Sequence, residues 1–143
     1  MCPNIQECVG FLATSICKIL SSEFDKQLEE FGITHKQAGI LWKCFDTPTS
    51  QTHLCDIANA DKNYVRFFID DLEAKGLVTR VKNPQNRREN MIHLTESGKE
   101  LALKTYEMLL RFQEGALLEH ISESEYESIK GILEKIYLGL YKN

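Results

Sequence analysis

The residues best suited to chemistry are five basic side chains that gather in one short stretch. Residues 75–88 contain two lysines, three arginines and no acidic residue, although the whole chain carries a formal charge of −4. Charge that is segregated in this way acts locally, because a phosphate responds to the nearest face of a protein. The pattern predicts a surface that binds phosphate and releases its counterions. Its members are Lys75, Arg80, Lys82, Arg87 and Arg88.

A second set of candidates lies just upstream, on a predicted helix over 62–75. Apolar residues recur along one side of this helix, which must face a core: Val65, Phe68, Ile69 and Leu72. The remaining surface carries Lys62, Asn63, Tyr64, Arg66, Phe67 and Asp70. Asparagine and arginine offer the paired donors and acceptors that base edges require, and an aromatic ring can pack on a thymine methyl group. The alternative is an ordinary solvated helix face.

Five cysteines are an odd number, and none forms a C-x-x-C pair. Reduced thiols therefore fit better than a disulfide framework. Cys8 and Cys17 lie on a predicted N-terminal helix and are the candidates for a redox role. Cys44 and Cys55 are interpreted as small apolar filler.

Other kinds of functional site find little support in the sequence. The four histidines share no close ligand spacing with the cysteines, so no metal site and no cofactor is expected. Phosphate-binding glycine loops and nucleophile motifs are also missing from the sequence, which predicts that the protein is not an enzyme. No run approaches the ~20 apolar residues of a membrane span, and no secretory signal is recognisable, so we expect a cytoplasmic location.

The elements that must position these residues can be derived from periodicity and capping signals. With 143 residues and 43% hydrophobic content, the chain is expected to form one globular domain. Helices are predicted over 4–30, from a capping box at Thr34 and Gln37, over 51–58, over 62–75, over 96–118, and from a second capping box at Ser122 and Glu125. Short strands are predicted over 77–81 and 91–94, joined by a long polar tip.

This order predicts a mainly α fold with a small β-hairpin wing (α+β), built on a winged helix-turn-helix. In that layout the second helix of the pair, over 62–75, enters the major groove of DNA. The basic wing, over 80–93, lies along the backbone or reaches the minor groove.

The stretch from Gly32 to Gly98 resembles the MarR family of bacterial transcription regulators. Residues 72–78, LEAKGLV, match the family pattern LE-x-KGLV. Asn83-Pro84, residues 86–88 and residues 92–98 match the wing pattern P-x-D-R-R followed by LT-x-x-G. The resemblance implies a dimer formed by interlocking first and last helices, and release from DNA by a small-molecule effector or by cysteine oxidation.

The sequence departs from the family pattern at one wing position. Asn86 stands where the family usually has aspartate, which is thought to hold the second wing arginine, here Arg88, by an ion pair. Asparagine can hydrogen-bond to a guanidinium group without pairing its charge, so we expect a looser wing tip. The family's reactive cysteine aligns with Gly10, so its particular sensing site is not expected in this chain.

The flanking helices suggest how the chain assembles. One domain over 1–143 would comprise a DNA-binding lobe over 33–95 and dimerisation helices over 4–31 and 96–143. The small lobe could not cover the apolar stripes of those helices, whereas a homodimer would bury them and place two reading helices about one turn of DNA apart (~34 Å).

These observations together predict a homodimeric, sequence-specific regulator that binds an inverted repeat in double-stranded DNA. The resemblance further implies that this regulator is a repressor, released from DNA by a small molecule or by oxidation. Two alternatives remain open. A winged-helix module could dock a protein instead of DNA, which the acidic pair Asp70 and Asp71 favours slightly. A thiol-based redox sensor could act through Cys8 or Cys17.

Overall fold

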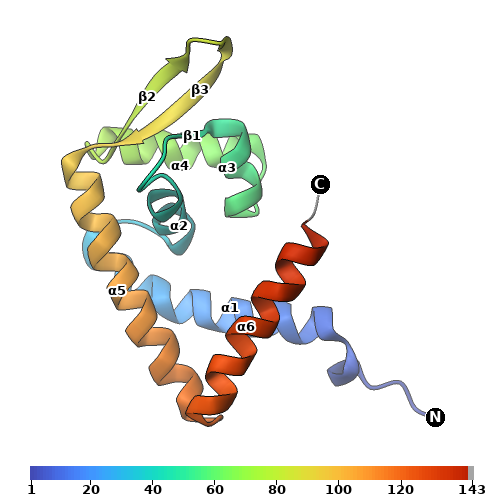
Figure 1. Ribbon diagram of the computed structural model, residues 1–143. Helices are drawn as coiled ribbons and strands as arrows, with labels where there is room; N and C mark the ends of the chain where they lie inside the picture. The colour runs from blue at the N-terminus through green and yellow to red at the C-terminus, as the bar shows by residue number, and fades with distance from the viewer. Residues whose placement is uncertain (142–143) are drawn as a thin grey trace. The chain divides into compact units, whose positions relative to one another are not determined.

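The computed structural model describes residues 1–141, and it confirms the predicted mainly α class with a small antiparallel sheet. The chain divides into two compact units, the first over Met1–Glu107 and the second from Met108 onward. The elements are η1 Ile5–Glu7, α1 Val9–Leu28, η2 Glu29–Phe31, α2 His35–Lys43, β1 Thr49–Ser50, α3 Gln51–Ala58, α4 Lys62–Ala74, β2 Val78–Asn83, β3 Asn86–Leu94, α5 Glu96–Leu118 and α6 Glu123–Leu140 (Figure 1).

Local capping signals fixed most helix starts correctly. Thr34 opens α2 and Ser122 opens α6, each through a complete capping box with the residue three positions on. Asp61 opens α4, where its carboxylate accepts hydrogen bonds from the backbone N–H groups of Asn63 and Tyr64. Such caps satisfy amide groups that no helical carbonyl can reach.

The predicted N-terminal helix is wrong at its start. Asn4 accepts a hydrogen bond from the backbone N–H of Gln6 and closes the short turn η1. Cys8 is then extended, and the regular helix α1 begins only at Val9. The asparagine side chain offers the backbone a local alternative to the helix, which periodicity alone does not reveal.

The hairpin differs more strongly from its prediction. The tip is two residues, Pro84 and Gln85, rather than a long polar loop, because both strands extend far beyond their predicted ends. A third strand, β1, was not predicted and pairs with β3 at Thr49 and Ser50, which gives the order β1-β3-β2. The polar residues near the end of the hairpin are therefore paired through the backbones of β2 and β3.

The first unit encloses one apolar core beneath this sheet. Its largest fully buried side chains come from every helix of the unit and from both long strands: Phe24, Leu28, Ile40, Leu41, Leu54, Val65, Ile69, Leu72, Val78, Ile92 and Thr105. Thr105, on α5, accepts a hydrogen bond from Trp42 Nε1 at 3.1 Å. Figure 1 shows the hairpin projecting beyond α3 and α4, which pack below it.

The base of the wing is closely bonded to the ends of α4 and α5. Gly76 ends α4 at φ 72°, and the N–H groups of Gly76 and Leu77 reach back to Glu73 and Leu72 as in a Schellman motif. The Thr95 hydroxyl donates to the Gly76 carbonyl oxygen at 2.7 Å. Gly98 lies so close to Leu77 that a Cβ would meet the Leu77 carbonyl oxygen at 2.0 Å. The glycine in the LT-x-x-G pattern is therefore a packing requirement.

The second unit contains the end of α5 and the last helix. Tyr126 is buried there, its hydroxyl accepts from Gln113 Nε2 at 3.0 Å, and Lys130 lies over its ring. Large apolar residues along α6 remain exposed: Ile129, Ile132, Leu133, Ile136, Tyr137, Leu138 and Leu140. Among residues 1–141, no helix is both long enough and apolar enough to cross a membrane.

Candidate nucleic-acid interface

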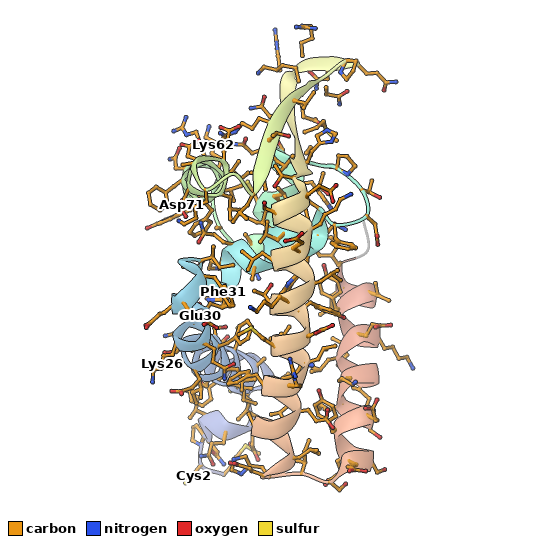
Figure 2. The ribbon with its side chains drawn as sticks, turned by 90° about the vertical axis from the view of Figure 1, so that its left-hand side faces the viewer. Cys2, Lys26, Glu30, Phe31, Lys62 and Asp71 are labelled. Carbon is orange, nitrogen blue, oxygen red and sulfur yellow. The ribbon has the colours of Figure 1, made fainter. Side chains whose placement is uncertain are left out.

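The outward side of α4 carries the predicted base-reading residues. Val65, Ile69 and Leu72 are buried, whereas Lys62, Asn63, Tyr64, Arg66 and Phe67 are all exposed. Figure 2 looks nearly along this helix and shows Lys62 and Asp71 on opposite sides of it, with Asp71 on the side of α2. Asn63 Oδ1 accepts from Arg66 Nη2 at 3.3 Å. This hydrogen bond links two exposed side chains one turn apart on α4.

Two large aromatic side chains interrupt this polar surface. Tyr64 is 62% exposed and Phe67 is 66% exposed, and both rings lie against Phe68, at centroid distances of 6.4 and 6.2 Å. Tyr64 and Phe67 thus add exposed apolar area to the polar side of α4.

The far end of the hairpin carries unpaired positive charge. Lys82, Arg87 and Arg88 are exposed, and within residues 1–141 none of them forms an ion pair. We call these three residues the wing tip. Asn86 Oδ1 accepts from the backbone N–H of Arg88 at 3.2 Å rather than from its guanidinium group. The expected contact between these two side chains is therefore replaced by a backbone contact that fixes the turn.

Arg80 lies in β2, inside the strand predicted over 77–81, but its side chain is not free to bind phosphate as predicted. That side chain is only 18% exposed. Its guanidinium group bridges Asp70 at 2.6 Å and Glu73 at 3.0 Å, both on α4. Alternation along the predicted strand places Arg80 on the same side as the buried Val78, but the acidic partners on α4 are set by tertiary packing, which the sequence does not show.

The remaining acidic residue of α4 is also occupied. Asp71 binds Lys75 Nζ one turn later and accepts from Gln37 Nε2 at 2.7 Å. These hydrogen bonds, the one from Lys75 first, hold the pKa of Asp71 below its ordinary value. Gln37 is itself buried and accepts from the backbone N–H of Thr34, so one amide joins the start of α2 to α4.

Lys36 of α2 stabilises the turn between α3 and α4, a role that was not predicted from the sequence. Asn59 ends α3 in the left-handed conformation, at φ 49°. Lys36, from α2, donates to the carbonyl oxygen of Ala58 at 2.6 Å. This contact spans 22 residues and leaves no local signal.

The cysteines and histidines are distributed over the chain. Cys8 and Cys17 are exposed thiols, whereas Cys44 is buried, and that burial raises the pKa of its thiol. Cys55 is partly buried and donates weakly to the Gln51 carbonyl oxygen. Among residues 1–141, His, Cys, Asp and Glu side chains form no group of three that could hold a metal ion.

One cavity of the first unit is mainly apolar. It measures about 370 Å³ and lies between the end of α2 and the first half of α5. Its walls are Trp42, Phe45, Asp46, Ala102, Leu103 and Tyr106.

The chain is similar in sequence to known transcriptional regulators. Residues 33–90 match the model of the MarR family. The uncharacterized HTH-type transcriptional regulator YdcH of Bacillus subtilis (strain 168) is 32% identical over 96 residues, which cover 64% of this chain and 65% of that protein. A putative transcriptional regulatory protein for the hcr operon of Thauera aromatica is 28% identical over 107 residues, or 74% of this chain and 64% of that protein. The chain thus matches just under two thirds of each relative's length.

Solved structures extend the likeness to nearly the whole chain. A MarR-family transcriptional regulator from Rhodococcus sp. RHA1 superposes with a TM-score of 0.84 at 21% identity, covering 94% of this chain and 96% of that one. MepR of S. aureus, solved as a DNA complex, superposes with a TM-score of 0.71 at 26% identity, covering 92% and 97%. The MarR-family match thus covers residues 33–90, and the fold around it is that of the Rhodococcus regulator.

Proposed function

We propose that the protein is a homodimeric transcription regulator, without enzymatic activity, that binds an inverted repeat in double-stranded DNA. Helix α4 would enter the major groove and read bases through Asn63, Tyr64, Arg66 and Phe67, with Lys62 at a phosphate beside them. The wing tip, Lys82, Arg87 and Arg88, would follow the backbone or the minor groove.

The observation that carries this proposal is the division of charge on the first unit. The wing tip keeps three cations unpaired on a hairpin that projects past α3 and α4 (Figure 1). The exposed side of α4 adds hydrogen-bonding groups of the kind that distinguish base pairs. Phosphate attraction alone would not require such a set, whereas sequence reading does.

The proposal of a homodimer rests on apolar residues left exposed on two helices. Helix α1 exposes Val9, Phe11, Leu12, Ile16 and Ile19, and α6 carries the exposed set described above. Exposed apolar area of this extent along whole helices is characteristic of interfaces. A second copy would bury these faces and supply the second reading helix.

The protein-docking alternative loses its main support in the structure. It was favoured by the acidic pair on α4, yet Asp70 is bound to Arg80 and Asp71 to Lys75. The helix therefore presents less free negative charge than its sequence indicates. The exposed aromatic residues Tyr64 and Phe67 suit either partner, so the nature of the partner is settled by experiment.

We further propose that the regulator is a repressor released by a small molecule or by thiol oxidation. The cavity beside Trp42 and Tyr106 offers aromatic walls and one carboxylate to a small molecule. Cys8 and Cys17 are accessible to oxidants, whereas the buried Cys44 is held as a thiol. Alkylation of the exposed cysteines before DNA binding would separate the two triggers, because an oxidant would then no longer release DNA.

The direct test is selection from a random duplex library with the purified protein at two salt concentrations, with the mass of the complex measured in parallel. We expect an enriched inverted repeat, bound by two copies and more weakly at high salt. Failure to enrich any duplex at either salt concentration would reject specific DNA binding by the unliganded protein. Enrichment of a single half-site by one copy would reject the dimer.

A further inference from the structure

The Arg80 side chain is the most heavily bonded charged group of the first unit. Besides its contacts to Asp70 and Glu73, its Nε donates to Gln51 Oε1 at 3.2 Å and its Nη2 to the Arg66 carbonyl oxygen at 3.4 Å. Its backbone N–H also donates to Glu73 Oε2 at 3.3 Å. One strand residue thus contacts the first residue of α3 and three residues of α4.

These contacts join the wing to the reading helix α4 and to the neighbouring helix α3. Arg80 lies in β2 and binds Gln51, the first residue of α3. It also binds Asp70, which lies on the side of α4 that carries Phe67. A guanidinium group can make this fork of bonds because its five N–H groups lie in a fixed plane. A lysine ammonium group would supply the same charge but not the fork.

We propose that Arg80 is a positioning residue, which sets the angle between the wing and the reading helix and does not bind phosphate itself. This inference rests on the proposed function, because the angle matters only if both parts meet one ligand. The same residue offsets one of the two negative charges of Asp70 and Glu73, whose free carboxylates would repel DNA. Its contribution is therefore to sequence preference, whereas the wing tip contributes general affinity.

The test compares two substitutions that keep the positive charge, Arg80→Lys and Arg88→Lys. Each variant is titrated with the selected duplex and with a scrambled duplex of equal length. We expect Arg80→Lys to lower the ratio of specific to scrambled affinity about tenfold, because the bonds across α3 and α4 are lost. Arg88→Lys should change that ratio less than about twofold, since lysine also serves as a point charge for phosphate.

A second variant, Asp70→Asn, separates the two roles by the quantity that changes. If Arg80 is a phosphate ligand, removing this negative charge should tighten binding to every duplex and leave the ratio of specific to scrambled affinity unchanged. If Arg80 positions the helix, Asp70→Asn lowers the ratio as Arg80→Lys does. The double variant should then be no worse than either single one, because both changes break the same contact.

A measurement without DNA keeps this inference separate from the proposed function. Exchange of the Arg80 Nε–H proton, followed by NMR in the free protein, should be slower than that of Arg88 and should accelerate in Asp70→Asn. Thermal unfolding of each variant identifies any that has lost its fold. Rapid exchange at Arg80, or an Arg80→Lys variant that keeps the parent ratio, would overturn the proposal.

Discussion

The two ends of the wing carry the same kind of side chain and use it in opposite ways. At the base, Arg80 is enclosed by Asp70, Glu73 and Gln51. At the tip, the cations of Arg87 and Arg88 have no acidic partner within residues 1–141. The number of basic residues in a stretch is therefore a poor guide to its role. Whether each charge is already neutralised inside the protein decides which of them a ligand can meet.

The largest expected effect is on stability, and it comes from a substitution that disrupts packing at the base of the wing and leaves the wing tip unchanged. Gly98→Ala places a Cβ against the Leu77 carbonyl oxygen, and the clash with backbone should lower the free energy of unfolding by about 1–3 kcal/mol. Gly115→Ala, in the same helix, has no atom within 4 Å of the added Cβ and should stabilise the helix by about 0.5–1 kcal/mol. Thermal unfolding measures both. Equal melting temperatures for the two variants would show that the base is not tightly packed.

The second prediction concerns a variant that removes two positive charges from the wing tip and leaves the base of the wing unchanged. The double substitution Arg87→Ala, Arg88→Ala should reduce the slope of log affinity against log salt by about four for the bound dimer, two from each copy, for every duplex alike. Stability should stay within about 0.5 kcal/mol of the parent, because neither side chain is bound within the protein. Arg111→Ala, which removes an exposed cation of α5, is the matched control and should leave the slope unchanged. An unchanged slope in the double variant would remove the wing from the interface.

The third prediction separates base reading from charge on α4. Asn63→Ala should reduce the preference for the selected sequence by about 1–2 kcal/mol, because it loses a base contact and frees the Arg66 guanidinium group. Lys62→Ala, one residue away, should weaken binding to selected and scrambled duplexes equally. Competition titrations with both duplexes measure the difference. If the two variants behave alike, the start of α4 does not read sequence.

The smallest expected effect concerns a single methyl group. If the exposed ring of Phe67 packs on a thymine, replacing that thymine by deoxyuridine should cost the parent about 0.8 kcal/mol of binding free energy. The same replacement should cost nothing in Phe67→Ala. Titration of duplexes substituted one thymine at a time would locate the contact. A parent that is indifferent to every substitution would exclude this role for Phe67.

How much of this could be predicted from the sequence depends on the range of each interaction. The caps at Thr34 and Ser122 act within three residues, and they were predicted correctly. The residues of β2 after 81 and of β3 before 91 were not predicted as strand. They are mostly polar residues with low intrinsic strand preference, and the backbone pairing between β2 and β3 holds them in the sheet.

The candidate site follows the same rule. The exposed face of α4 was predicted from helical periodicity, and the structure exposes Lys62 and the four proposed base-reading residues. The ion pairs of Arg80 require the packing of β2 against α4, and the hydrogen bond from Lys36 to the α3–α4 turn requires the tertiary fold. Neither leaves a signal that a local window could detect.

Arginine footprinting tests the central contrast most directly. The protein would be treated with an arginine-specific dicarbonyl reagent, with and without the selected duplex, and the modified residues identified by mass spectrometry. We predict that Arg87 and Arg88 react in the free protein and are protected by DNA, whereas Arg80 stays unreactive in both states. An Arg80 that reacts freely and is protected by the duplex, or a wing tip that DNA leaves unprotected, would contradict this account.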